Sequence, residues 1–174
     1  MGKLIWDQFR EQYNCTGPWQ ETAIFFLVLT AISVYDIRRY IIPDTLVLAG
    51  VVNRLLFMFI TMGGAAWSAL WIPLIRGLVT GVLVYIISML CERLTGAETM
   101  GGGDIKMLCM TGMYLTVPDS VRALLIACVS GAIYGIFRKF LKRNIRPVFP
   151  FGPFIALGVV LVYLDHGKIF FPVV

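Results

Sequence analysis

The stretch AAWSALWIPLIRGLVTGVLVYIISMLC, residues 65–91, contains a single charged residue, Arg76. It is longer than the about 20 apolar residues that a helix needs to cross the hydrocarbon core of a bilayer. The rest of the chain has the same character, since 59% of its residues are hydrophobic, 14% are charged and the mean hydropathy is +0.83. Soluble domains are about half apolar and about a quarter charged. The chain is therefore predicted to be an integral membrane protein.

Six apolar runs predict the fold class, an all-α polytopic membrane protein with about six transmembrane helices. The runs cover residues 19–36, 43–62, 65–91, 105–117, 121–137 and 150–164. They predict one six-helix membrane domain over residues 19–165. An extracytoplasmic N-terminal segment, residues 1–18, precedes it, and a short C-terminal tail, residues 166–174, follows it.

Basic residues are concentrated in alternate loops of this topology. They follow the first predicted span, lie between the third and fourth, and lie between the fifth and sixth: Arg38, Arg39, Arg93, Arg138, Lys139, Lys142, Arg143 and Arg146. The other loops, residues 63–64 and 118–120, contain no Lys or Arg. The positive-inside rule places the basic loops in the cytoplasm and both termini outside, as expected of a multi-pass protein of the cytoplasmic (inner) membrane. Because topology accounts for the net charge of +5, the lipid bilayer is an expected partner and nucleic acid is not.

The stretch TMGGGDIKML, residues 99–108, interrupts the apolar pattern with three glycines, an aspartate and a lysine. Two predicted spans separate Asp104 from Asp36, so both carboxylates are expected on the cytoplasmic side. The predicted helix over residues 105–117 is about 20 Å long, against a hydrocarbon core of about 30 Å. The glycine segment is the only candidate on the inner side to make up this difference. Irregular backbone at such depth lies buried in protein or lines a wet cavity, so Asp104 is expected in a cavity below the membrane surface.

Two aspartates on one side of a membrane match the chemistry of aspartic proteases. There one carboxylate activates water as a general base, and the other carboxyl is protonated and polarises the scissile carbonyl. Asp104 precedes a predicted helix, whose N-terminal dipole favours an anion, whereas Asp36 ends one, where the dipole disfavours it. These dipoles predict Asp104 as the base and Asp36 as the acid.

Three motifs resemble those of the type IV prepilin peptidases. YDIRRYIIPD, residues 35–44, is similar to the first catalytic segment of that family, and GGGDIKML, residues 101–108, resembles its GxGD motif with the following lysine. PFGPFIALG, residues 150–158, is similar to the motif that begins the last helix. The motifs occur in the family's order on six predicted spans.

The resemblance implies an intramembrane aspartyl endopeptidase that removes the short basic leader from type IV prepilins or pseudopilins at the cytoplasmic membrane face. The expected substrate has a basic leader and an apolar helix. By position, Asp36 and Asp104 are the catalytic pair. The other motif residues, which shape or support the site, are Gly101, Gly103, Lys106, Pro43, Asp44, Pro150, Phe151, Gly152 and Pro153.

Longer members of the family carry two CxxC pairs that bind zinc in a cytoplasmic domain associated with N-methylation. Here the cysteines stand singly: Cys15, Cys91, Cys109 and Cys128. The chain therefore resembles a short, peptidase-only form, with no metal and no cofactor expected. The sequence leaves N-methyltransferase activity as an open question.

Other functions fit parts of the pattern. Tyr35 and Asp36 also form the YD pair of presenilin-like GxGD proteases, but those are larger and end in a Pro-Ala-Leu motif that this sequence lacks. A preflagellin peptidase, or a non-catalytic scaffold or transporter of a pilus or secretion system, is a further alternative, although transporters often show an internal repeat and none is found. Arg54 and Arg76 fall inside apolar runs without an obvious acidic partner, so snorkelling to the interface is expected for both.

Overall fold

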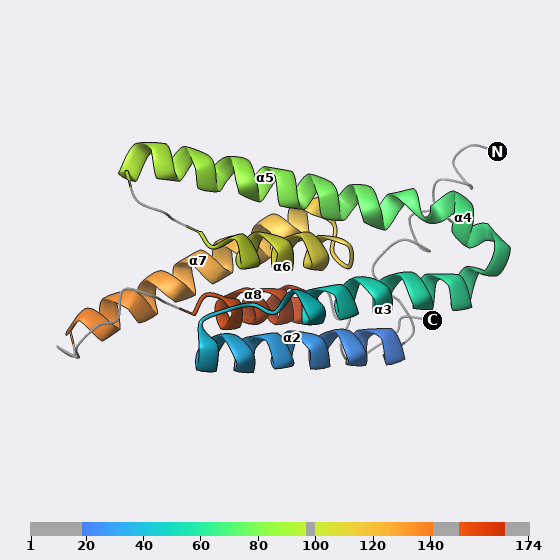
Figure 1. The fold of residues 1–174 in the computed structure, drawn as a ribbon, viewed down its shortest axis with the longest axis horizontal. Coiled ribbons are helices and arrows are strands. Elements are labelled where there is room, and N and C mark those ends of the chain that lie inside the picture. Colours follow the sequence, from blue (N-terminus) through green and yellow to red (C-terminus); the bar gives the residue numbers. More distant parts are fainter. Residues whose placement is uncertain (1–18, 97–99, 141–149, 166–174) are drawn as a thin grey trace.

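The computed structural model describes residues 19–96, 100–140 and 150–165, and the predicted N-terminal segment and C-terminal tail lie outside these ranges. The described residues form helices and no β-strand (Figure 1), as the sequence predicts. The elements in chain order are α2 (Trp19–Arg39), α3 (Asp44–Met62), the 3-10 turn η1 (Gly63–Ala65), α4 (Ala66–Ala69), α5 (Trp71–Thr95), α6 (Gly102–Gly112), α7 (Val117–Phe140) and α8 (Gly152–Asp165).

Four segments of the described chain are long and apolar enough to cross a membrane. They are α2, α3, α4 together with α5 over Ala66–Thr95, and α7 over Val117–Phe137. The shorter α8 has 14 residues and is also apolar. These helices confirm the prediction of an all-α polytopic membrane protein.

The predicted span over residues 105–117 is wrong. Helix α6 has 11 residues and ends at Gly112, so it is about 17 Å long and does not cross a hydrocarbon core of about 30 Å. Its first turn includes Gly102 and Gly103, so of the three glycines only Gly101 lies outside the helix. The irregular backbone instead follows the helix as a turn that contains Met113, Tyr114 and Leu115, all at least 96% buried. Non-helical backbone is tolerated at membrane depth where it is buried in protein, as this turn is.

Helix α6 lies inside the bundle, with α5 on one side and α3 on the other (Figure 1). Small residues bring α5 and α6 together: a Cβ at Gly77 would lie 2.8 Å from the carbonyl oxygen of Cys109, and one at Gly112 would lie 2.6 Å from Oγ1 of Thr80. Close backbone approach through small residues is the usual way in which membrane helices associate. The short helix is thereby held against a full-length span.

Side chains from α2, α6, α7 and α8 fill the core. Those with at most 1% exposure are Phe25, Leu29, Ile32, Met107, Leu108, Met110, Ala123, Ala127, Ile155 and Val159, with Leu115 of the turn after α6. Many other large apolar side chains remain exposed on the outside of the bundle, such as Leu27, Leu56 and Leu125. In a bilayer these side chains face lipid, which is as apolar as they are.

A polar cluster is buried where α2 and α3 meet the turn after α6. Nη1 of Arg54 lies 2.7 Å from Oε1 of Glu21, and Nδ2 of Asn53 donates to the Tyr114 hydroxyl at 3.0 Å. The Tyr114 hydroxyl donates in turn to the carbonyl of Gly50 at 2.6 Å, and its ring stacks on Phe25. The expectation of snorkelling is therefore wrong for Arg54, because Glu21 at the start of α2 pairs with it.

Candidate active site

Helix α2 carries Asp36 near its C-terminal end, two residues before the basic pair Arg38 and Arg39. Only 5% of Asp36 is exposed. Its Oδ2 atom accepts a hydrogen bond from the backbone N–H of Gly152, the first residue of α8, at 2.8 Å. A Cβ at Gly152 would lie 2.9 Å from that same oxygen. Glycine is therefore needed at this position for the backbone to approach the carboxylate.

Helix α6 carries Asp104 in its first turn. Gly101 precedes the helix in an extended conformation, with φ −68° and ψ 145°, and its backbone N–H is bonded to the Asp104 carboxylate. A Cβ at Gly103 would lie 3.0 Å from the Cβ of Ile42, which belongs to the connection between α2 and α3. The start of α6 is thus packed closely against the segment that follows Asp36.

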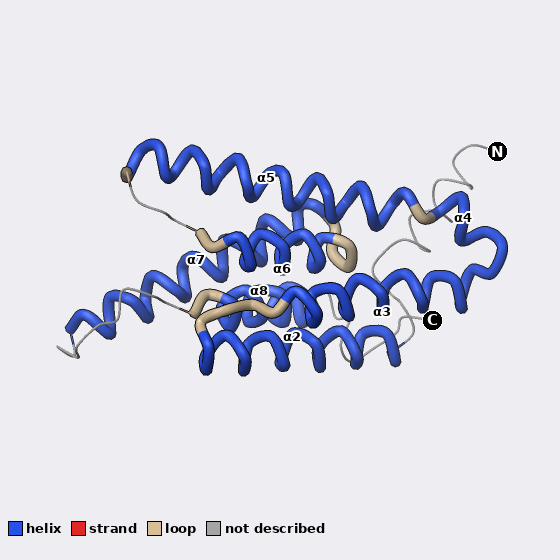
Figure 2. The backbone as a smooth tube through the Cα atoms, viewed as in Figure 1, coloured by secondary structure: helices blue, strands red, loops and turns tan. Residues whose placement is uncertain are grey.

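Asp36 and Asp104 line one cavity of about 640 Å³. Its walls come from the end of α2, the α2–α3 connection, the start of α3, the first turn of α6 and the segment before α8. Figure 2 shows the α2–α3 connection as a loop. The residues that line it are Asp36, Tyr40, Ile41, Ile42, Pro43, Asp44, Thr45, Gly101, Gly103, Asp104, Lys106 and Phe151. The fold therefore brings two carboxyl groups from different helices to a single hollow.

Asp104 lies in the first turn of the short helix α6, which is not one of the four helices long enough to span a membrane. Burial raises the pKa of Asp104 to about 7, and the charge of nearby Asp36 adds to the shift, while the hydrogen bond from Gly101 opposes it. The dipole of α6 favours the anion on Asp104, as predicted from the sequence, but burial and a like charge act in the opposite direction. The structure therefore favours the protonated form of Asp104 below neutral pH.

Lys106 and Asp44 form an ion pair at the rim of the cavity. Nζ of Lys106 lies 2.8 Å from Oδ1 and 2.9 Å from Oδ2 of Asp44. The two side chains are 56% and 71% exposed, so the pair contributes little to stability, at most about 1 kcal/mol. The Lys106–Asp44 pair lines the same cavity as Asp36 and Asp104, so a ligand that enters the cavity passes close to it.

The sequence motifs meet here only in part. Of the predicted site residues, Gly152 reaches the cavity through its hydrogen bond to Asp36, and most others line it. Pro150 and Pro153 are not among the lining residues.

Four lining residues were not predicted: Tyr40, Ile41, Ile42 and Thr45. Tyr40 has a φ of 57°, a left-handed conformation that is uncommon for a bulky residue, and its N–H bonds to the carbonyl of Asp36 at 2.7 Å. The only signal for the first three was their place inside the motif of residues 35–44.

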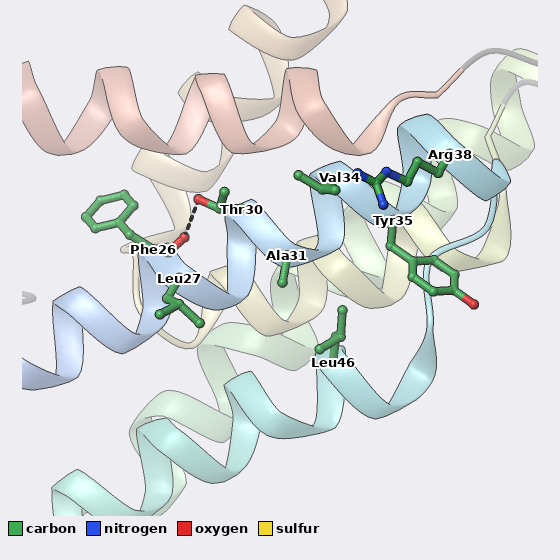
Figure 3. Close-up of a pocket in the computed structure, with 8 residues that line it drawn as sticks. All are labelled: Phe26, Leu27, Thr30, Ala31, Val34, Tyr35, Arg38 and Leu46. Carbon is green, nitrogen blue, oxygen red and sulfur yellow. Dashed lines mark hydrogen bonds between the residues drawn. The ribbon is translucent and has the colours of Figure 1, made fainter.

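A second hollow lies on the outside of the bundle, along α2. Figure 3 shows Arg38 and Tyr35 at one end of it, Phe26 and Leu27 at the other, and Leu46 of α3 beside it. Its lining is mostly apolar, and none of the residues around it lines the aspartate cavity. We refer to it as the α2 groove.

Metal ligands do not gather within the described residues: no group of three or more His, Cys, Asp or Glu side chains is placed to hold an ion. Cys91, Cys109 and Cys128 are free thiols there, and Cys15 lies outside the described part of the chain.

Comparison with known proteins gives a consistent picture. Residues 23–136 match the model of the type IV leader peptidase family. The prepilin leader peptidase/N-methyltransferase of Stutzerimonas stutzeri is 31% identical over 158 residues, which are 85% of this chain and 52% of that protein. The protein of the same name from Aeromonas salmonicida is 33% identical over 151 residues, 82% of this chain and 49% of the relative. The chain thus spans about half the length of the curated relatives it matches, and no solved structure matches it.

Proposed function

The chain belongs to the type IV leader peptidase family, and we propose on this basis that it is an intramembrane aspartyl endopeptidase that removes the leader from type IV prepilins or pseudopilins. The observation that carries the proposal is the shared cavity, into which α2 contributes Asp36 and α6 contributes Asp104. Two carboxyl groups that interact electrostatically in one hollow are what the hydrolysis of a peptide bond by aspartates requires.

The two carboxyl groups then have different tasks. Asp36 accepts the N–H of Gly152 at Oδ2, and its charge is one of the causes that raise the pKa of Asp104. We therefore assign Asp36 as the general base that takes a proton from the attacking water. Asp104, whose pKa is raised to about 7, is the acid that polarises the scissile carbonyl. This assignment reverses the one expected from helix dipoles alone. The pair titrates as a unit, so each pKa that an experiment measures belongs to both groups.

The aspartate end of the bundle faces the cytoplasm in this proposal, and the protein lies in the inner membrane with both termini outside. Support comes from the charges at this end: Arg38 and Arg39 end α2, and Arg93 lies in the last turn of α5. The positive-inside rule assigns such helix ends to the cytoplasm.

The substrate in this proposal has a basic leader and an apolar helix. Asp44 supplies an exposed carboxylate at the cavity rim, where it is held by Lys106. A lysine or arginine of the leader would exchange with Lys106 as the partner of Asp44. Such exchange is accessible because an exposed ion pair is only marginally stable.

The proposal is tested by co-expressing the chain with a panel of type IV prepilins and pseudopilins in membranes. The variants are Asp36→Asn and Asp104→Asn, and Asp165→Asn, at the end of α8, is the matched control. Mass spectrometry of the product's N-terminus reports cleavage and also whether a methyl group is added.

Asparagine keeps the size of aspartate but cannot exchange a proton. Both site variants should therefore lose processing at unchanged expression, while Asp165→Asn and the wild type retain it. Processing that survives both site substitutions would exclude the aspartyl mechanism and favour a non-catalytic scaffold.

A further inference from the structure

An opening separates α3 from α5 on the side of the bundle. The two helices flank α6 (Figure 1) and, over the described residues, their backbones do not pack against one another. Between them lies a groove of about 650 Å³, with walls from α3 and α5 and a floor from α6. We refer to it as the α3–α5 groove.

The walls of the α3–α5 groove are apolar and exposed. Leu48 on α3 is 61% exposed, and Leu78 and Val82 on α5 are 63% and 48% exposed. The floor is formed by Ile105 and Cys109 of α6, and it lies close to α5 because Gly81 leaves room there: a Cβ at Gly81 would lie 3.2 Å from the Cβ of Cys109. The groove is about 10 Å long on α3, from Asp44 to Val51, which is about two helical turns.

The groove is continuous with the aspartate cavity. Asp44 and Lys106 line both hollows, so their ion pair stands at the junction. The α2 groove of Figure 3 is also mostly apolar and is slightly larger, about 730 Å³, but it shares no residue with the aspartate cavity. Continuity with the carboxyl groups therefore distinguishes the α3–α5 groove from the other apolar surface.

We propose, resting on the function proposed above, that the α3–α5 groove holds the apolar helix of the prepilin-type substrate. An apolar helix reaches the site sideways from the bilayer, where its backbone hydrogen bonds are satisfied internally. The residues that precede this helix then pass the Asp44–Lys106 pair and enter the cavity between Asp36 and Asp104. The exposed side chains Leu48, Leu78 and Val82 contact the helix, and Cys109 and Ile105 support it from below.

Photocrosslinking tests the location directly. p-Benzoylphenylalanine is placed at Leu48 or Val82 in the α3–α5 groove, and at Leu27 or Val34 in the α2 groove as matched controls. The chain carries Asp104→Asn so that the substrate stays uncleaved, and the probe is a full-length prepilin from the panel above. Adducts with the prepilin are expected at the first two positions and not at the other two.

Adducts at Leu27 or Val34 in equal or greater yield would overturn the proposal. So would the absence of a protein adduct at all four positions with a prepilin that the wild type cleaves, because lipid would then be the occupant of the groove. Adducts confined to the α3–α5 groove, with a prepilin that the wild type does not cleave, would uphold the docking site while contradicting the proposed peptidase activity.

Steric variants provide a kinetic readout. Leu48→Trp and Val82→Trp fill the groove, and Leu27→Trp is the control on a lipid-facing surface. The groove variants should lower kcat/KM by about tenfold or more, chiefly by raising KM. The reason is that the groove binds the substrate helix equally in the ground state and in the transition state. Unchanged kinetics in both, with an active wild type, would overturn the docking site and leave the peptidase proposal intact.

Discussion

The backbone N–H of Gly152 donates a hydrogen bond of 2.8 Å to Oδ2 of Asp36, across 116 residues of sequence. The contact joins the start of α8 to the end of α2 and aims a backbone dipole at one of the two cavity carboxylates. It gives the motif of residues 150–158 a physical role, since the glycine supplies both the donor and the space that the carboxylate occupies.

Replacing Gly152 with alanine should impair catalysis more than folding. The new Cβ would lie 2.9 Å from Oδ2 of Asp36, so the carboxylate must move, and a displacement of about 1 Å in a catalytic group costs about 100-fold in rate. Initial rates of prepilin cleavage in proteoliposomes measure the loss. The control is Gly135→Ala on α7, where an added Cβ meets nothing within 4 Å. Equal activity of the two variants would contradict the role given to the Asp36–Gly152 contact.

The pH dependence of cleavage should reveal which aspartate holds the proton. Burial and the charge of Asp36 raise the pKa of Asp104 to about 7, so Asp104 keeps its proton below this pH and loses it above. If Asp104 is the acid, kcat/KM falls as the pH rises through about 7. A pH–rate profile in detergent or proteoliposomes, with Asp165→Asn as control, measures this limb. A rate that continues to rise well above neutral pH would instead identify Asp104 as the base.

Asp44 should affect recognition of a basic leader and leave stability almost unchanged. Its pair with Lys106 is exposed, so Asp44→Asn should lower the free energy of unfolding by less than about 1 kcal/mol. The same change should raise KM for a leader that contains lysine or arginine. A substrate whose leader basic residues are replaced by glutamine is the control, and it should not respond to Asp44→Asn. An equal change in KM for both substrates would exclude charge recognition at Asp44.

Removing one partner of the buried Glu21–Arg54 pair should destabilise the bundle strongly. Arg54→Met leaves the Glu21 carboxylate buried without its cation, which costs about 3–5 kcal/mol. The double variant Glu21→Gln with Arg54→Met removes both charges and should regain most of the loss. Equilibrium unfolding in detergent micelles measures both, with exposed Arg39→Ala as the control. A double variant as unstable as the single one would show that the lost stability does not come from the unpaired charge.

Local patterns in the sequence predicted the helices well and their lengths less well. Apolar runs define α2, α3, α5 and α7 because a membrane span leaves its signal in consecutive residues. The predicted span over residues 105–117 failed at both ends: Gly102 lies inside α6, and the helix stops at Gly112. The apolar run continues past Gly112 because Met113 to Leu115 are buried in the protein. Buried residues are apolar in a turn as well as in a helix, so composition does not show where the helix ends.

By itself, the sequence determined that this is a helical membrane protein and that Asp36 and Asp104 are its candidate catalytic residues, because hydropathy and short motifs are properties of neighbouring residues. The tertiary structure decided the relations between distant ones. It paired Arg54 with Glu21, set the amide of Gly152 on Asp36, and buried Asp104 near the charge of Asp36, which acts against the dipole of α6. The physical reason is that burial and charge proximity outweigh a local dipole, and both depend on how the helices pack together.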